Sequence, residues 1–271
     1  MQYDPIKKSL GKVFNRTPFL RIIFYRLLDL LLLRTWYIKK ELRKWRKSAP
    51  KDAMILDAGS GFGQYVWRLS QMGKKFRILG VDVKQEQIDD CNNFFSKKNL
   101  SNRVQFQVAD LVTFSDKDKY DLVLSVDVME HIEEDEKVMK NLCHSLKKGG
   151  MLLISTPSDQ GGSDTYDHGD EVTGFIAEHV RDGYSIEDIE GKLKRAGFST
   201  IESIYSYGKA GNIAWRLSMK CPIMTLNKSK LFFILLPFYY VIAYPIAFIL
   251  NVIDTLGNHK KGTGLIVKAI K

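Results

Sequence analysis

The sequence predicts an α/β fold in which a mainly parallel sheet carries helices on both faces. Three observations support this prediction. Short apolar runs of strand length alternate with longer amphipathic runs, glycines follow the first apolar run, and an acidic residue closes the second. At 271 residues, the chain is long enough for one large domain with appended segments.

The first half of the expected sheet lies within residues 53–109. Residues 53–58 form an apolar run that ends at a Gly-rich turn, which is typical of a buried strand. A helix over 64–73, a strand over 76–82 and a helix over 85–97 follow. Residues 103–109 alternate between apolar and polar side chains, as a further strand should.

The second half follows the same order. We expect a strand over 120–126, a helix over 133–147 that ends before Gly149-Gly150, and a strand over 151–156 that stops at Pro157. Residues 158–174 are polar and predict a long loop, and loops of that length are often functional. The last expected elements are a helix over 185–196 and strands over 199–207 and 264–270.

The N-terminal segment predicts one basic amphipathic helix over 19–47. Apolar side chains such as Ile23, Tyr37 and Leu42 share one arc of this helix, and cations that include Arg21 share the opposite arc. Such a helix suits a membrane surface. The alternative is a helix that packs on the domain and covers a ligand.

Residues 231–250 contain no charged side chain, and twenty apolar residues can span a membrane. A single crossing would place the strands at 199–207 and 264–270 on opposite sides of the bilayer. Pro237 and Pro245 should also interrupt the helix. We therefore expect a broken, re-entrant or surface-lying insertion, with a buried lid or a dimer interface as the alternative.

Charge and cysteine usage exclude several classes of protein. Residues 1–50 carry a formal charge of +10, residues 51–208 carry −8 and residues 209–271 carry +8. Since the middle segment is acidic, nucleic acid is not the expected partner, and the basic ends suit an anionic membrane, with His259 among them. The three cysteines show no CxxC spacing, which excludes a disulfide scaffold and suits a reducing compartment. No cleavable signal peptide is expected.

A candidate ligand site follows the first expected strand. Asp57, Gly59, Gly61 and Gly63 form the stretch DAGSGFG, in which glycines permit positive φ and a close approach to a ligand. In open α/β sheets, ligands bind at the carboxyl ends of the strands. Asp82 ends the second strand, where an acid can bind a ribose diol. The glycine spacing differs from the GxGxxG of NAD-binding proteins.

Five motifs in order resemble those of class I S-adenosylmethionine-dependent methyltransferases. They are LDAGSGFG, VDV at 81–83, VAD at 108–110, DLVLSVDVMEHI at 121–132 and LKKGGMLLISTP at 146–157. The VMEHI stretch is similar to that of the ubiquinone-biosynthesis O-methyltransferases. The resemblance implies a Rossmann-like seven-stranded sheet whose seventh strand is antiparallel to the others, with S-adenosylmethionine as the cofactor.

The same resemblance implies the residues of the cofactor site. Asp57 and Gly59 would lie near the methionine end, Asp82 would bind the ribose hydroxyls, and Asp110 and Leu111 would flank the adenine. The full expected set is Asp57, Ala58, Gly59, Ser60, Gly61, Gly63, Asp82, Val83, Asp110, Leu111, Ser125 and Asp127.

Methyl transfer needs alignment of donor and acceptor, and a base where the acceptor must lose a proton. Glu130 and His131 follow the fourth strand, and His179 and Tyr184 precede the helix at 185–196; these four are the catalytic candidates. Alternatively, Glu130 and His131 only shape the cofactor pocket, and Tyr184 is packed while Arg181 pairs with Asp182 or Glu178. A divalent metal at Glu130 and His131 is possible but not favoured, so no metal site is assigned.

These observations predict a monotopic, membrane-associated methyltransferase on the cytoplasmic face of a membrane. The expected acceptor is a lipid or lipid-linked molecule, with O-methylation favoured over N-methylation. The alternatives are a soluble small-molecule methyltransferase whose apolar insertion is a lid or dimer surface, and a non-catalytic membrane scaffold. The expected units are the helical segment 1–50, the catalytic domain 51–208, the apolar insertion 209–262 and the final strand 263–271.

Overall fold

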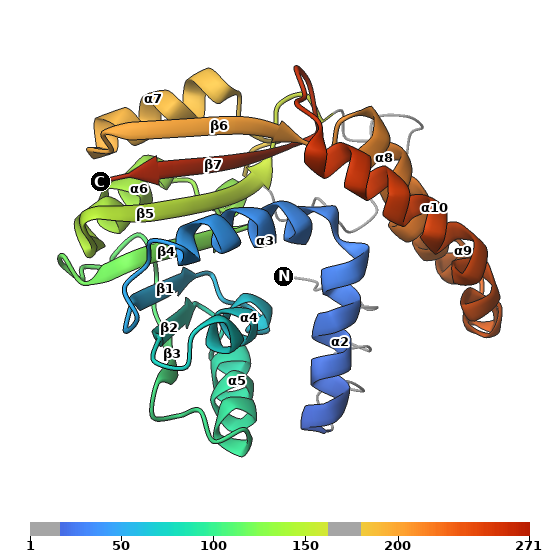
Figure 1. Cartoon of the computed structure of the whole chain (residues 1–271), viewed down its shortest axis with the longest axis horizontal. Helices are drawn as coiled ribbons and strands as arrows, with labels where there is room; N and C mark the ends of the chain where they lie inside the picture. The colour runs from blue at the N-terminus through green and yellow to red at the C-terminus, as the bar shows by residue number, and fades with distance from the viewer. Residues whose placement is uncertain (1–16, 162–179) are drawn as a thin grey trace.

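The computed structural model describes residues 17–161 and 180–271, and it contains one seven-stranded sheet (Figure 1). The strand order is β3-β2-β1-β4-β5-β7-β6. β7 is antiparallel to both of its neighbours, whereas β1 to β5 pair in parallel, so the predicted fold class is confirmed. The strands are β1 (Met54–Ala58), β2 (Arg77–Asp82), β3 (Val104–Val108), β4 (Tyr120–Val126), β5 (Leu146–Pro157), β6 (Thr200–Ser206) and β7 (Gly264–Ile270).

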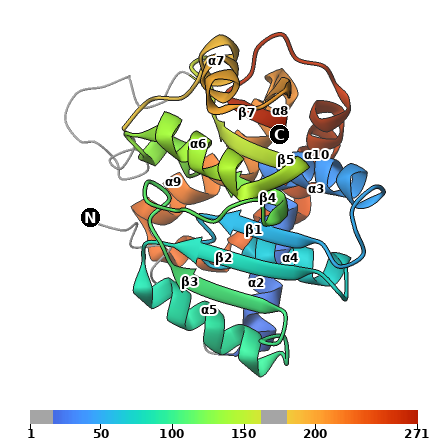
Figure 2. The same cartoon turned by 90° about the vertical axis from the view of Figure 1, so that its left-hand side faces the viewer.

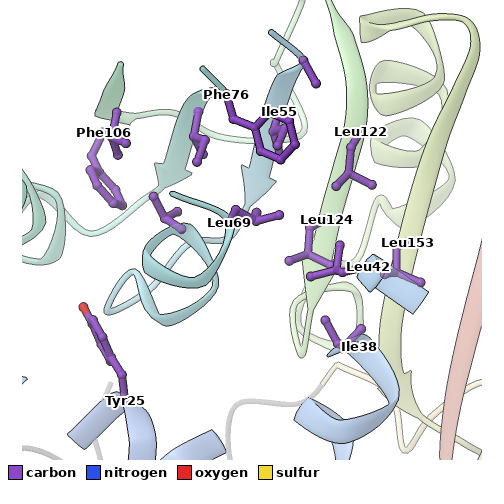
Figure 3. Packing of buried hydrophobic residues seen from close by; sticks show 14 of the residues in the cluster. Tyr25, Ile38, Leu42, Ile55, Leu69, Phe76, Phe106, Leu122, Leu124 and Leu153 are labelled. Atoms are coloured by element: carbon purple, nitrogen blue, oxygen red, sulfur yellow. The ribbon is translucent and has the colours of Figure 1, made fainter. Parts of the chain in front are cut away.

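Helices cover both faces of the sheet, as Figures 1 and 2 show. One face packs against α2 (Pro18–Leu31), α3 (Leu33–Arg46), α4 (Gln64–Met72) and α5 (Gln85–Lys97). In this layer, Ile38 and Leu42 of α3 lie beside Leu124 and Leu153 of the sheet (Figure 3). The other face packs against α6 (Asp135–Ser145) and α7 (Ile186–Ala196).

β5 begins five residues earlier than predicted. Leu146 already pairs with Tyr120, and the register then shifts before Leu122 pairs with Met151. Gly149 has a φ of +77°, so it takes up this irregularity inside the strand. The Gly149-Gly150 pair therefore lies inside a strand and does not end a helix, which corrects the expectation from the sequence.

The single helix predicted over 19–47 is in fact two helices with a break at Leu32. Leu32 is extended, with φ −93° and ψ 111°. The carbonyls freed at the end of α2 are partnered by side chains of α3. The Thr35 hydroxyl donates to the Asp29 carbonyl at 3.1 Å, and Trp36 Nε1 donates to the Leu30 carbonyl at 3.2 Å. The Thr35 hydroxyl also lies 2.6 Å from the carbonyl of Leu32 at the break itself. Side-chain bonds of this kind compete with helix continuation.

Arg21 corrects the expected amphipathic pattern of this segment, because its side chain is only 2% exposed. It forms an ion pair with Asp90 of α5 at 2.6 Å and donates to the Phe62 carbonyl in the Gly-rich loop at 2.8 Å. Buried charges require such partners. α2 is therefore packed on the domain next to the loop, which was the alternative interpretation.

A helical hairpin connects β6 to β7 and extends away from the sheet (Figure 1). Its outgoing arm contains α8 (Lys209–Trp215), a π-helical turn η2 (Arg216–Lys220) and α9 (Cys221–Lys228); its tip is the 3-10 turn η3 (Lys230–Ile234), and its returning arm is α10 (Leu236–Leu256). Tyr239 and Tyr240 of α10 donate to the carbonyls of Leu217 and Ser218, each at 2.7 Å. These bonds hold the two arms together.

α10 is continuous, which corrects the expectation that prolines would interrupt it. Pro237 lies in the first turn, where a helix tolerates proline because the N–H has no partner there. Pro245 lies inside the helix without ending it. α10 is the one described helix that is long and apolar enough to cross a membrane, and only 17% of its most apolar window is buried. Most of this window is therefore exposed.

Candidate active site

The loop after β1 is shaped by glycines for close approach of a ligand. Gly59, Gly61 and Gly63 all have positive φ, between +47° and +86°. A Cβ on Gly59 would come within 2.3 Å of the Val128 side chain, so this position excludes every larger residue. At Gly61 an added Cβ would have room, because the nearest atom to it would be the Gln87 Oε1 at 3.9 Å.

Two carboxylates flank this loop. Asp57 is 2% exposed, and its Oδ2 has no hydrogen-bond partner among the described residues. Burial, and then the charge of Asp82, raises the pKa of Asp57 to about 7. Asp82 accepts from the N–H groups of Gly61 and Lys84, each at 3.0 Å, which fixes its carboxylate beside the loop.

A second acidic pair follows β4. Asp127 has a φ of +53°, an uncommon conformation for a residue other than glycine, and its N–H donates to the Ser155 carbonyl. Glu130 lies in the 3-10 turn η1 (Met129–His131), is 1% exposed and accepts from the Thr156 hydroxyl at 3.1 Å. Burial, and then Asp127, raises the pKa of Glu130 to about 8.

Three residues that the sequence analysis missed complete this cluster. Arg34 of α3 pairs with Asp127 at 2.9 Å, and its backbone N–H donates to the Tyr207 hydroxyl at 3.1 Å. The Tyr65 hydroxyl on α4 is buried without a partner among the described residues, within electrostatic range of Arg34, Asp127, Tyr207 and Asp57. No local pattern marks these residues, because the break at Leu32 and the end of β6 bring them together.

Within the short turn η1, Glu130 is buried and His131 is exposed. Within residues 17–161 and 180–271, no group of three or more His, Cys, Asp or Glu side chains is arranged to hold a metal ion. Of the two side chains, Glu130 is the one that is buried close to Asp127 and Arg34.

Tyr184 does not have the position expected of a catalytic residue. It is 1% exposed, and its hydroxyl lies 2.7 Å from Asp135 Oδ2 and 3.1 Å from the Met129 carbonyl. Arg181 pairs with the same carboxylate at 2.5 Å instead of with Asp182, and Glu178 lies outside the described residues. The bonded, buried hydroxyl of Tyr184 fits the packed alternative. His179 lies outside the described residues.

The remaining predicted cofactor residues lie along the carboxyl edge of the sheet. Ala58 ends β1, Val83 and Asp110 follow β2 and β3, and Leu111 is buried next to Asp110. Ser60 and Ser125 are buried, and the hydroxyl of each has no partner among the described residues.

These atoms fit a cofactor that carries both polar and charged groups. The Asp57 carboxylate, the hydroxyls of Ser60, Ser125 and Tyr65, and the glycine loop line one edge of the sheet. Buried polar atoms rarely lack partners, so a polar ligand at this edge would satisfy them. Asp57 suits an ammonium group and Asp82 suits a ribose diol.

Comparisons with known proteins agree with this geometry. Residues 50–195 match the model of a family described as a methyltransferase domain. A ubiquinone biosynthesis O-methyltransferase of Rickettsia bellii is 30% identical over 105 residues. That match covers 39% of this chain, and the chain spans 42% of the relative's length.

Two solved structures share the fold. Phosphoethanolamine N-methyltransferase 2 of Haemonchus contortus, in complex with S-adenosyl-L-methionine, is 18% identical with a TM-score of 0.60, covering 99% of this chain and 60% of that one. The [4+2]-cyclase SpnF is 17% identical with a TM-score of 0.57, covering 88% and 82%. At these identities the likeness concerns the fold alone. Because the family model covers more than half of the sequence, the chain belongs to the methyltransferase domain family.

Proposed function

We propose that this chain is an S-adenosylmethionine-dependent methyltransferase and that it transfers a methyl group to a hydroxyl of a lipid or lipid-linked acceptor at a membrane surface. The observation that carries the O-methylation is Glu130, a buried carboxyl beside Asp127 and Arg34 whose pKa is raised to about 8. A carboxylate with a raised pKa is a stronger base than an ordinary glutamate, so it can accept a proton from a hydroxyl.

The cofactor would lie along the carboxyl edge of β1 and β2. Asp57 would bind the ammonium of the methionine end, Arg34 and Tyr65 would face the carboxylate of the same end, and Asp82 would bind the ribose diol. When bound, S-adenosylmethionine supplies a methyl group that is attached to a positively charged sulfonium. After transfer of the methyl group, the rest of the cofactor leaves as a neutral thioether.

The residues of this chain would orient the acceptor and take its proton. As the bond forms between the acceptor oxygen and the methyl carbon, the hydroxyl proton would pass to Glu130. Thr156 donates to the Glu130 carboxylate and keeps it in place. His131 would be an alternative base, and His179 would be an acceptor-side residue.

Membrane attachment is proposed from the hairpin. Its tip and α10 carry exposed apolar side chains, and both arms return to neighbouring strands of one sheet, which favours insertion from one side over a single crossing. Residues 209–271 hold nine basic residues and one acidic residue, which suits an anionic leaflet. The exposed apolar residues include Leu231, Ile234, Phe238, Val241, Ile242 and Ile249.

The test uses purified protein, methyl-labelled S-adenosylmethionine and a total membrane-lipid extract. We expect label in the organic phase, and we expect it to disappear with Glu130→Gln while this variant still binds S-adenosylmethionine. Mass spectrometry of the labelled species would identify the acceptor. Label confined to water-soluble products would reject the lipid acceptor and favour the alternative, in which the hairpin is a surface for a second copy.

A further inference from the structure

Asp254 is a buried charge in the most apolar helix of the protein. It lies near the end of α10 and is 0% exposed. Its carboxylate is fully bonded: Oδ1 accepts from the Tyr37 hydroxyl at 2.7 Å, and Oδ2 accepts from the Gly211 N–H at 2.8 Å. A buried carboxylate costs free energy, so it requires partners as complete as these.

These two bonds connect three elements. Tyr37 belongs to α3, Gly211 to α8 and Asp254 to α10. A Cβ on Gly211 would lie 2.7 Å from the Asp254 carboxylate, so glycine is required for this approach. His259 adds a contact from the loop after α10, 3.4 Å from Oδ2 and 2.8 Å from the Asp254 carbonyl. This position corrects the expectation that His259 belongs to a membrane-facing basic end.

α3 also meets the residues that lead from β6 into α8 at the candidate active site. Arg34 lies one turn before Tyr37 on α3, and Tyr207 lies four residues before Gly211. The Arg34 N–H has no partner within its own helix, because it is in the first turn, and it bonds the Tyr207 hydroxyl instead. The Asp254 bonds and the Arg34 bond therefore both connect α3 to residues 207–211, which lead into and begin α8.

We infer that Asp254 is a positioning residue: by fastening α10 to α3 and α8, it holds Arg34 against Asp127 and Tyr207 at the cofactor site. Lys40 adds a further bond between α3 and the end of α10, since its Nζ donates to the Thr255 carbonyl at 2.7 Å. The inference rests on the proposed role of Arg34 at the methionine end of the cofactor. According to this inference, the hairpin strengthens cofactor binding although it does not contact the cofactor.

The test is a double-mutant cycle read by calorimetry of S-adenosylmethionine binding to the full chain. We expect Asp254→Asn and Tyr37→Phe each to weaken binding about fivefold, and to weaken it less than about twofold in an Arg34→Ala background. Tyr37→Phe keeps the ring in place, so it serves as the second variant if Asp254→Asn does not fold.

The matched control is Asp121→Asn. Asp121 accepts from the Met54 N–H at 2.7 Å and pairs with Lys147, at the opposite edge of the sheet. It should change the dissociation constant less than about twofold in either background. Equal losses with and without Arg34, or no loss in the unmodified chain, would overturn the inference. Since no acceptor is present, failure of the proposed lipid methylation leaves this readout unaffected.

Discussion

At the scale of single residues, two buried carboxyls carry the proposed chemistry, and burial is the first cause of the raised pKa of each. A carboxyl whose pKa is higher in the folded than in the unfolded chain stabilises the fold at low pH. That stabilisation is complete below the unfolded pKa near 4 and is lost as the pH rises to about 7 for Asp57 and about 8 for Glu130.

Glu130 predicts a pH-dependent rate. As a base it must be ionised, so we expect kcat to rise with pH and to level off above about 8. Glu130→Gln should lower kcat by about 100-fold or more and remove this rise, while the KM for S-adenosylmethionine stays within about threefold. Steady-state rates between pH 6 and 9.5 measure this. A Gln variant with the same pH profile would exclude Glu130 as the base.

Asp57 predicts a pH-dependent affinity. An ammonium group favours the ionised carboxylate, so binding should weaken by at most about tenfold per pH unit below a pH of about 7. Asp57→Asn should bind more weakly and show a flat profile. Calorimetric dissociation constants from pH 5.5 to 8.5 test this, and a wild-type profile without slope would contradict the assignment.

At the scale of elements, the strands and the glycine loop could be predicted from the sequence, because their signals are local. The apolar run 53–58 and the glycines at 59, 61 and 63 specify strand and turn within a few residues. The break at Leu32 has no such signal, since neither glycine nor proline occurs there. It depends on contacts with α3 side chains and on packing of α2 against α5. Sequence periodicity therefore misplaced Arg21, and it left Arg34 as an exception to the amphipathic pattern with no role assigned.

Thr35 tests the origin of the helix break. Thr35→Val keeps the shape of this fully buried side chain and removes its bond to the Leu32 carbonyl. We expect the free energy of unfolding to fall by about 1–2 kcal/mol, since a buried acceptor loses a partner. Urea unfolding measures this, with Thr113→Val as an exposed control. Equal stability of both variants would assign the break to packing alone.

At the scale of the whole molecule, an acidic catalytic unit lies between two basic segments, and this charge order was visible in the sequence. The sequence could not decide whether the apolar run is buried, because length and composition are the same for a core helix and a membrane helix. The arrangement of α10 beside α8, outside the sheet layers, leaves its apolar side chains exposed.

The whole chain should bind anionic vesicles, and binding should weaken as salt rises from 50 to 500 mM because the basic ends are screened. Replacing Phe238, Val241 and Ile242 by serine should reduce vesicle binding by at least about tenfold, since three apolar side chains no longer enter the bilayer. Ile204→Ser, on the edge strand β6, is the control. Co-sedimentation measures both effects, and unchanged binding of the triple variant would reject the hairpin as the anchor.

The position of β7 has a consequence for biosynthesis. Among the described strands, β6 pairs with β7 alone, and β7 pairs with β5 on its other side, so β6 lacks this partner until the later strand has been translated. The apolar hairpin lies between them in sequence and therefore leaves the ribosome while the sheet is still open. Strand pairings this distant form slowly and leave apolar segments accessible in the meantime. A nascent chain would thus present its hairpin to a nearby bilayer before the catalytic domain is complete.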